Sequence, residues 1–216
     1  MSDDEQAIID ALLARRGDLQ GCVESLTAAH GSLIESFGTG GKFLVCGNGG
    51  SQADAMHIAG ELCKSFERKR PVPPEMTAAL EGLPWGDELA EHLEVGLPTI
   101  ALGLSASLKT AIENDSSLRD IAFAQETYAL AKRSDVFMAI STSGDAANCL
   151  MAMSVAKAVG CTTIALTGPH GGKLAMHADI AIKAPGDSTK VVQEAHVCLY
   201  HTLCLLVEAH FFPNAR

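Results

Sequence analysis

Two side chains that could bind a metal ion or exchange protons stand four residues apart, at His57 and Glu61. Four residues are close to one helical turn, so in a helix both groups project from one face and can meet the same ligand. The spacing also describes an ordinary exposed helix pair, and taken alone it favours that interpretation. The position of the pair favours a functional role, because a glycine-rich turn stands just before it.

That turn is Gly47-Asn48-Gly49-Gly50, and it follows the apolar run 43–46. Such a run is typical of a strand covered on both faces of a parallel sheet. We expect Ser51 to cap a helix that continues to about Lys64. The unpaired N–H groups at the start of that helix favour an anion such as phosphate. The turn matches neither of two known phosphate-binding motifs. Gln52 stands where a dinucleotide-binding turn needs glycine, and a Walker loop would end in Gly-Lys-Ser/Thr.

A second turn of this kind follows the apolar run 136–140. It reads Ser141-Thr142-Ser143-Gly144 and leads into a helix that continues to about Val159. Three hydroxyls beside helix N–H groups suit phosphate oxygens, whereas an ordinary helix cap explains one hydroxyl well and three less well. Both turns would lie at the carboxyl ends of parallel strands, where open α/β folds bind ligands. We therefore predict a phosphate site at this second turn.

Further strands are expected at 99–102, 161–166 and 180–184, which makes an α/β fold with a parallel sheet. The last predicted helix, 190–210, carries Gln193 and His201. They are eight residues apart and so lie within about a quarter-turn of each other on the helix. Composition alone predicts a buried core histidine at position 201.

The chain divides into a helical segment, 1–41, and an α/β domain, 42–216. The first segment has apolar residues at helical spacing and would pack on the outside of the sheet or against another subunit. Within the domain, 66–97 is predicted to be a surface insertion with short helices near 74–80 and 87–93. For its basic cluster, 68–70, a solvated charge run is favoured over a position bordering the anion site.

Composition excludes several classes of protein. The 216 residues are 47% hydrophobic, which suffices for a sizeable core, and the formal charge of −10 argues against a nucleic-acid partner. The seven cysteines include no C-x-x-C pair and predict free thiols in a reducing cytoplasm. We expect no secretory leader, and no apolar segment reaches the roughly 20 residues that a membrane span needs.

The chain resembles the sugar isomerase (SIS) fold, and more closely the phosphoheptose isomerase family, in four segments: FLVCGNGGSQADAMHIAGEL, AISTSGDAANCL, IALTGPHGGKLA and VVQEAHVCLYH. The first segment is quite specific for this family, whereas many SIS proteins share the Ser-Thr-Ser-Gly turn. The resemblance covers most of the chain outside 66–97. It implies a three-layer fold with a five-stranded parallel sheet between helices. It also implies a homotetramer with active sites at subunit interfaces, where the N-terminal helix would pack.

The resemblance implies a role for each residue that matches a family motif. Substrate would contact Asn48, Gly49, Gly50, Ser51, Asn114 and Asp115, and its phosphate would contact Ser141, Thr142 and Ser143. One Zn²⁺ per subunit would be bound by His57, Glu61, Gln193 and His201. Glu61 and Gln193 also count as substrate contacts. Glu61 and His201 match the acid–base pair, and Asp115 counts with them as catalytic.

The activity implied is the isomerisation of sedoheptulose 7-phosphate to D-glycero-D-manno-heptose 7-phosphate through an enediol(ate), in heptose biosynthesis. Glu61 would remove the carbon-bound proton while His201 manages the oxygen proton. The alternative is a non-catalytic SIS protein that binds sugar phosphates or other proteins, as one relative does in controlling replication initiation. Retention of both Glu61 and His201 favours the enzyme.

Three positions depart from the family pattern. Asp145 replaces the common Asn and puts a negative charge beside the predicted phosphate site, which at about 4 Å costs roughly 1 to 4 kcal/mol without compensation. Ala146 replaces a phosphate-binding Ser. The stretch 190–192 lacks an Arg that usually precedes Val-Gln-Glu. These changes bear on the preferred substrate more than on the fold.

Overall fold

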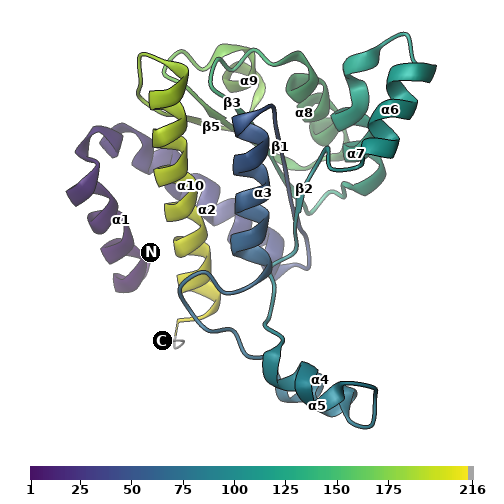
Figure 1. Cartoon of the computed structure of the whole chain (residues 1–216). Coiled ribbons are helices and arrows are strands. Elements are labelled where there is room, and N and C mark those ends of the chain that lie inside the picture. Colours follow the sequence, from purple (N-terminus) through teal and green to yellow (C-terminus); the bar gives the residue numbers. More distant parts are fainter. Residues whose placement is uncertain (214–216) are drawn as a thin grey trace.

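A computed structural model describes residues 1–213 of the chain (Figure 1). At its centre is a five-stranded sheet formed by β1 (Phe43–Gly47), β2 (Thr99–Ala101), β3 (Val136–Ser141), β4 (Thr162–Thr167) and β5 (Ile180–Lys183). Neighbouring strands are parallel in the order β2-β1-β3-β4-β5. The chain extends from β1 to one edge and then returns to β3 on the other side. The carboxyl ends of β1 and β3 therefore form the switch point, where ligands bind in open α/β sheets.

Helices cover both faces of this sheet, which confirms the predicted three-layer α/β fold. One face is covered by α2 (Val23–Gly38), α3 (Gly50–Cys63) and α10 (Thr189–Phe211), with α1 (Asp3–Arg15) packed against α10. The other face is covered by α7 (Ala122–Leu130), α8 (Ala147–Val159) and α9 (Gly172–His177). A further helix, α6 (Ala106–Asp115), and two 3-10 turns, η1 (Gly17–Cys22) and η2 (Arg119–Ile121), complete this body. The expected contact of α1 with another subunit stays a prediction.

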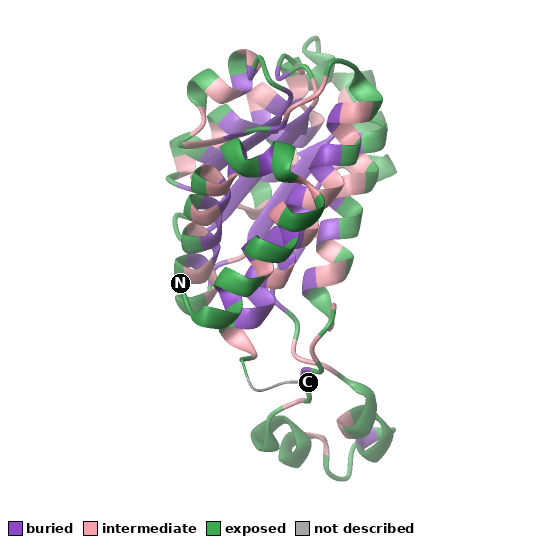
Figure 2. Ribbon diagram, turned by 90° about the vertical axis from the view of Figure 1, so that its left-hand side faces the viewer, coloured by how far each residue is buried: buried purple, intermediate pink, exposed green. Residues whose placement is uncertain are grey.

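Strand β1 shows why the sequence predicted a strand covered on both sides. Phe43 and Val45 belong to the core under α3 and α10, whereas Leu44 and Cys46 belong to the core under α7 and α8. All four are fully buried. Alternate side chains of a strand point to opposite faces, so a strand between two helical layers must be apolar at every position. The buried sheet stands out between the more exposed helices in Figure 2.

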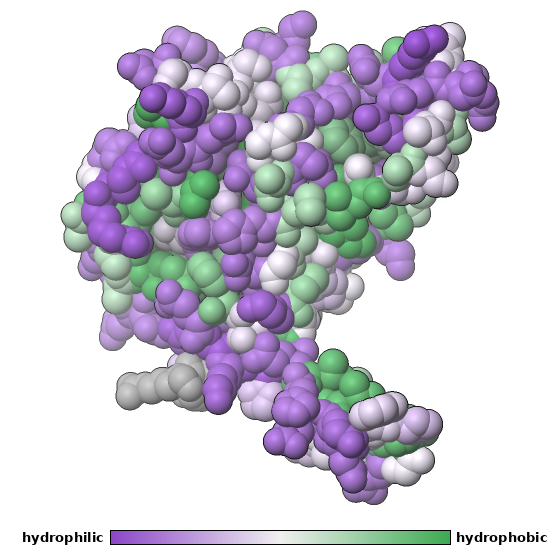
Figure 3. All heavy atoms as spheres, viewed as in Figure 1, coloured by the Kyte–Doolittle hydropathy of each residue, from purple (hydrophilic) through white to green (hydrophobic). Residues whose placement is uncertain are grey.

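The predicted insertion forms a projecting arm of two short helices, α4 (Pro74–Leu80) and α5 (Gly86–His92). A backbone bridge between Pro71 and Glu94 closes its base. Most of its residues are exposed, and its apolar side chains form part of its surface (Figures 2 and 3). Trp85, at the tip between the helices, has φ 63° and is 74% exposed. The prediction of two short surface helices is confirmed, and that the segment is an insertion stays a prediction.

The basic cluster at the base of the arm differs from the predicted solvated run. Arg70 is completely buried, and Arg68 pairs with Asp4. Only Lys69 is fully exposed. The prediction was therefore wrong for Arg70, because a fully buried acidic partner, Glu208, lies next to it.

Over residues 1–213, helices of the length and apolar character needed to cross a membrane are absent.

Candidate active site

The turn after β1 brings the start of α3 close to the strand. Gly49, with φ 55°, is the residue before the helix, and the helix begins at Gly50. Ser51 lies buried in the first turn and makes no capping hydrogen bond, so its prediction as the helix cap was wrong. A Cβ on Gly47 would lie 2.6 Å from the Ser51 carbonyl oxygen. The tight turn that these glycines allow therefore starts the helix before Ser51.

Three of the four predicted metal ligands meet where α3 and α10 lie side by side. His57 Nε2 is 2.9 Å from Glu61 Oε1, and the His57 and His201 rings have centroids 4.9 Å apart in an edge-to-face arrangement. The His57 side chain is 45% exposed, whereas that of Glu61 is 16% exposed. Two imidazoles and a carboxylate of one chain thus share a cluster that is open to solvent on the His57 side.

Gln193 lies apart from this cluster. A Cβ on Gly50 would lie 2.4 Å from Gln193 Nε2, so the amide is packed against the first residue of α3. Along α10, Gln193 precedes His201 by eight residues, a rise of about 12 Å. The predicted spacing correctly placed both residues on one side of the helix, but it did not show that the amide faces Gly50.

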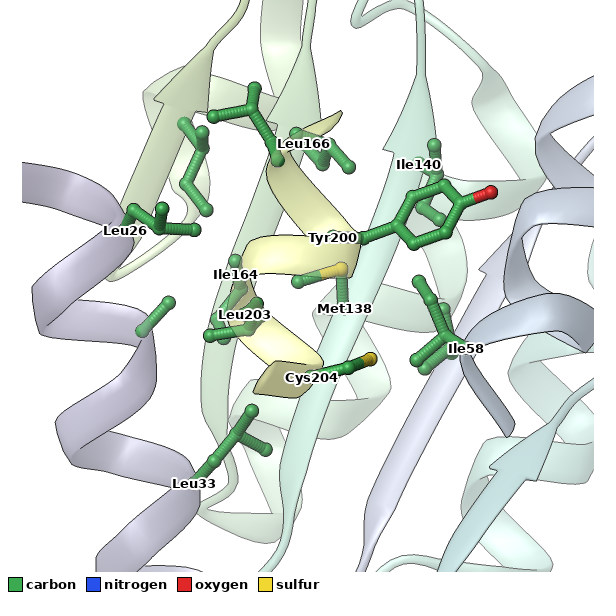
Figure 4. Packing of buried hydrophobic residues seen from close by; sticks show 14 of the residues in the cluster. Leu26, Leu33, Ile58, Met138, Ile140, Ile164, Leu166, Tyr200, Leu203 and Cys204 are labelled. Carbon is green, nitrogen blue, oxygen red and sulfur yellow. The ribbon is translucent and has the colours of Figure 1, made fainter. Parts of the chain in front are cut away.

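Tyr200 and Asp54 form a second layer of hydrogen bonds around His57. The Tyr200 hydroxyl is 3.0 Å from His57 Nδ1 and 3.3 Å from Asp54 Oδ1. Figure 4 shows the Tyr200 ring extending from α10 to the side where Ile58 of α3 lies. Burial, reinforced by the charge of Asp54, raises the pKa of the tyrosine, so Tyr200 stays a neutral hydroxyl. A hydroxyl at Nδ1 fixes the His57 ring with Nε2 toward Glu61.

His201 is suited to the role of a neutral proton carrier or metal ligand. Burial, with repulsion from His57, lowers its pKa below the usual range, although Glu61 acts in the opposite direction. Its Nε2 atom is buried and has no hydrogen-bond partner within residues 1–213. Buried polar atoms are normally paired, so this atom indicates a missing ligand or substrate group.

A fully buried ion pair joins the two helices that carry the cluster. Arg70 Nε and Nη2 donate to Glu208 Oε1 at 3.0 and 2.8 Å, and both side chains are 0% exposed. The same guanidinium donates to the carbonyls of Leu62, at 2.8 Å, and Glu61, at 3.3 Å. Arg70 thus links the last turn of α3 to the last turn of α10. Glu61 lies in that last turn of α3, and His201 lies two turns earlier in α10.

The switch point contains a cavity of about 380 Å³. Two of the predicted substrate contacts, Asn48 and Gly49, line it, together with the cations Lys109 and Arg119. Asn48 also exchanges two hydrogen bonds of 2.9 Å with the Asn148 amide of α8. This amide pair ties the turn after β1 to the helix after β3 across the switch point.

The hydroxyl turn after β3 faces a second cavity of about 210 Å³. Thr142 and Ser143 line it, and so do Ser188 and Thr189 at the start of α10. Ser141 is buried and accepts a hydrogen bond from the Gly144 N–H. Hydroxyls from two elements and the N-terminus of a long helix give this cavity the donors that a phosphate needs.

Two departures from the family pattern have structural consequences here. The Asp145 carboxylate is exposed and accepts the Lys173 backbone N–H at 3.1 Å, so α9 partly offsets its charge. Ala146 stands at the N-cap of α8, where no side chain caps the helix. The Cys149 N–H donates to Asn148 Oδ1 at 3.0 Å, so only the N–H groups of the first two residues of α8 lack a side-chain acceptor beside the hydroxyl turn.

Asn114 and Asp115 are predicted sugar contacts that the structure leaves away from the cluster. They are the last residues of α6, are exposed, and hydrogen bond to each other at 2.8 Å. Neither lines the switch-point cavity, although their neighbour Glu113 does. The predicted residues are thus distributed over five places: the α3–α10 cluster, the contact of Gln193 with Gly50, each of the two cavities at the strand ends, and the end of α6.

Comparison with known proteins identifies the family. The SIS domain family model matches residues 19–168. Phosphoheptose isomerase of Trichlorobacter lovleyi is 40% identical over 180 residues, which are 83% of this chain and 79% of the relative. The chain belongs to the phosphoheptose isomerase family. The Roseiflexus phosphoheptose isomerase is 35% identical over 98% of this chain and 93% of its own length.

Solved structures of phosphoheptose isomerases agree with this assignment. The Neisseria gonorrhoeae phosphoheptose isomerase matches with a TM-score of 0.70 at 30% identity and covers 94% of this chain and 96% of its own. The Francisella tularensis phosphoheptose isomerase matches with a TM-score of 0.73 at 28% identity, over 96% of this chain and 98% of its own. The family resemblance in the sequence is therefore confirmed.

Sequence reasoning missed three polar residues of this phosphoheptose isomerase family member. Tyr200 adjoins His201, but neighbours on a helix point about 100° apart, so the search along one face passed over it. Asp54 lies three residues before His57 and shares its face, a signal that could have been used. Asn148 pairs with a residue 100 positions earlier, and the sequence carries no local sign of that contact.

Proposed function

We propose that the chain is an aldose–ketose isomerase that converts sedoheptulose 7-phosphate to D-glycero-D-manno-heptose 7-phosphate in heptose biosynthesis. The observation that carries this proposal is the meeting of Glu61 and His201 in one cluster between α3 and α10. An isomerisation of this kind removes a proton beside a carbonyl and returns it one carbon away. It needs a base, a second proton carrier and donors for the enediolate oxygens.

Glu61 is the base in this proposal. Its carboxylate lies 2.9 Å from His57 Nε2, and the Tyr200 hydroxyl contacts the other nitrogen of the same ring. His201, neutral because its pKa is lowered, moves the proton between the two sugar oxygens. Asp115 and Asn114 contact the sugar from the end of α6. Because both are exposed in one chain, this contact depends on substrate or on a second subunit bringing them to the cluster.

The phosphate of the substrate binds at the hydroxyl turn in this proposal. Ser141, Thr142 and Ser143 supply hydroxyls, and the first two residues of α8 supply N–H groups. The glycine-rich turn at 48–51 contacts the sugar chain from the neighbouring strand end. The switch-point cavity on the same edge of the sheet is lined by the cations Lys109 and Arg119 and by three carboxylates, those of Glu113, Asp120 and Glu126, so it adds no net positive charge.

The α3–α10 cluster has the donor types for a zinc ion, although its three ligand atoms do not all lie within 4.8 Å of one another and must close around the ion. The unpaired Nε2 of His201 and the His57–Glu61 pair supply two nitrogen donors and one oxygen donor, the set that zinc prefers. Gln193 completes the predicted set only if its amide turns away from Gly50. A bound zinc ion would polarise the carbonyl oxygen of the sugar. Tyr200, at the other ring nitrogen of His57, holds that ligand in the required tautomer.

The assembly and location of the protein also belong to this proposal. We propose a cytoplasmic homotetramer with active sites at subunit interfaces, α1 at one of them, and no nucleic-acid or membrane partner. The 45% exposure of His57 supports it, because one chain leaves the cluster uncovered. The division of the chain into a helical segment, 1–41, and an α/β domain, 42–216, also stays a prediction.

The test is turnover of sedoheptulose 7-phosphate by Glu61→Gln and by the control Glu91→Gln, an exposed residue on the arm. Exchange of the proton beside the carbonyl is followed in deuterated water. Glu61→Gln should abolish exchange and keep the oligomeric state of the parent, whereas Glu91→Gln should behave as the parent does. An active Glu61→Gln protein would remove Glu61 from the mechanism. A parent that binds the sugar phosphate without exchange would support the non-catalytic alternative.

A further inference from the structure

Three helices bring together a second group of metal-ligating side chains, which we term the terminal cluster: Glu5 of α1, His30 of α2 and His210 of α10. Glu5 Oε1 is 3.5 Å from His30 Nε2 and 3.3 Å from His210 Nδ1. One ligand atom from each residue lies within 4.8 Å of the other two. Within residues 1–213, this is the one group of three His, Cys, Asp or Glu side chains that meets this distance limit.

The local structure of α1 presents Glu5 to the two imidazoles. Glu5 is the third residue of the helix, and its Oε2 accepts the Ser2 N–H at 2.7 Å, while its own N–H donates to the Ser2 hydroxyl. This capping box fixes the carboxylate and leaves Oε1 facing His30 and His210. Glu5 is 4% exposed, so its charge is held away from water without a Lys or Arg partner among the described residues.

His30 supplies an unsatisfied donor atom in this cluster. It is 7% exposed, and its Nε2 is buried without a hydrogen-bond partner in the described part of the chain. The 3.5 Å separation from Glu5 is too long for a good hydrogen bond. The Nε2 atom thus faces the Glu5 carboxylate without a hydrogen bond of its own.

Two of the three separations in this cluster match those of ligands around one metal ion, and the third, between the two histidines, is within 4.8 Å. With metal–ligand bonds of about 2.0 to 2.1 Å, neighbouring ligands of a tetrahedral site are about 3.3 Å apart. The two distances from Glu5 Oε1, 3.5 and 3.3 Å, are close to that value. We propose that the terminal cluster binds a divalent transition-metal ion through Glu5, His30 and His210, with a fourth position open beside the exposed His210.

This site is separate from the cluster in the proposed active site. His210 follows His201 by nine residues on α10, a rise of about 13 Å. Its ligands come from α1, α2 and the end of α10, so a bound ion fastens the N-terminal helix to the last helix. Two imidazoles and a carboxylate suit zinc and its neighbours in the first transition row. The role is structural, because no residue of the proposed mechanism belongs to it.

The experiment counts zinc per chain and separates the two clusters by mutation. Four proteins are compared: the parent, His210→Ala, His57→Ala/His201→Ala, and the triple variant. Each is stripped with chelator, reloaded with zinc chloride, desalted and measured by elemental analysis. His210 is exposed, so its removal should leave folding intact, and circular dichroism checks this. His92→Ala, an exposed histidine at the end of α5, is the matched control.

We expect His210→Ala to remove one zinc per chain both from the parent and from the His57→Ala/His201→Ala background. Its zinc affinity at this site should fall by more than about tenfold, since even outer-shell changes cost that much. Zinc should raise the melting temperature of the double variant and have no such effect on the triple variant. His92→Ala should change neither quantity. An unchanged zinc count in both His210→Ala proteins would overturn the proposal.

Cobalt(II) gives an independent reading of the same site. In the His57→Ala/His201→Ala background, cobalt bound to two imidazoles and a carboxylate should show the visible absorption of a tetrahedral ion. The triple variant should not show it. An octahedral spectrum that is the same in both proteins would mean that the ion sits elsewhere and would also overturn the proposal. Because the active-site histidines are absent from both proteins, the result does not depend on the proposed activity.

Discussion

Replacing Arg70 by Met tests whether the buried ion pair fixes the two helices of the candidate site. Arg70 and Glu208 are both 0% exposed. The substitution leaves Glu208 as a buried carboxylate with two remaining donors, the backbone N–H groups of Phe66 and Glu67 at 2.9 Å. It also removes the donor to the Leu62 carbonyl at the end of α3.

The size of the effect follows from burial. Removing one partner of a buried pair costs about 3 to 5 kcal/mol, because the other charge stays out of water. That is a large share of a total stability of about 5 to 15 kcal/mol. The matched control is Lys157→Met, which breaks the exposed Lys157–Asp179 pair at 2.6 Å. Exposed pairs contribute about 0 to 1 kcal/mol, so the control should change stability little.

The assay is urea unfolding followed by circular dichroism at one fixed protein concentration. Arg70→Met should lower the unfolding free energy by about 3 to 5 kcal/mol. Adding Glu208→Met should cost less than the sum of the two single changes, since no unpaired charge is then left buried. If Arg70→Met and Lys157→Met lower stability equally, the pair does not hold α3 and α10 together.

Three other outcomes are expected. Ser143→Ala should raise KM for the sugar phosphate roughly 10- to 100-fold, the effect of one charge-assisted hydrogen bond, with a smaller change in kcat; an unchanged KM would place the phosphate elsewhere. Chelation of the His210→Ala protein should abolish turnover and zinc should restore it, whereas activity without metal would make the ion incidental. Burial lowers the pKa of His196, so the unfolded chain binds more protons and stability should fall as the pH drops below about 6.5. His196→Gln should flatten that dependence in unfolding midpoints measured from pH 5 to 8, and an equal slope would exclude His196 as its source.

The sheet was predictable because its signals are local. The central strands β1 and β3 are short apolar runs beside glycines or polar residues, and burial on both faces requires such a run. The arm was predictable for a similar reason, since Pro71, Pro73 and Pro74 cannot continue a helix or a central strand. Ser51 shows the limit of local signals. Serine is a good cap in general, but the conformation of Gly49 starts the helix earlier.

Arg70 was not predictable from its neighbours in the chain. Its sequence context is a basic run, and such runs are usually solvated. Its burial depends on Glu208, 138 residues away, and on the carbonyls at the end of α3. The pairing of Tyr200 with His57 spans 143 residues and is of the same kind. Both contacts arise only when α10 packs on α3, and no pattern within either helix specifies their relative position.

Gly50 lies at one contact between these two helices. The absence of a Cβ lets the Gln193 amide pack against the start of α3, where any side chain would overlap it. The helices run in the same direction from this contact. Seven residues after Gly50 the chain reaches His57, and eight residues after Gln193 it reaches His201, so the rises of about 10.5 and 12 Å nearly match. The contact between Gly50 and Gln193 therefore accompanies the register in which the two imidazoles come together, and it turns the Gln193 amide away from them.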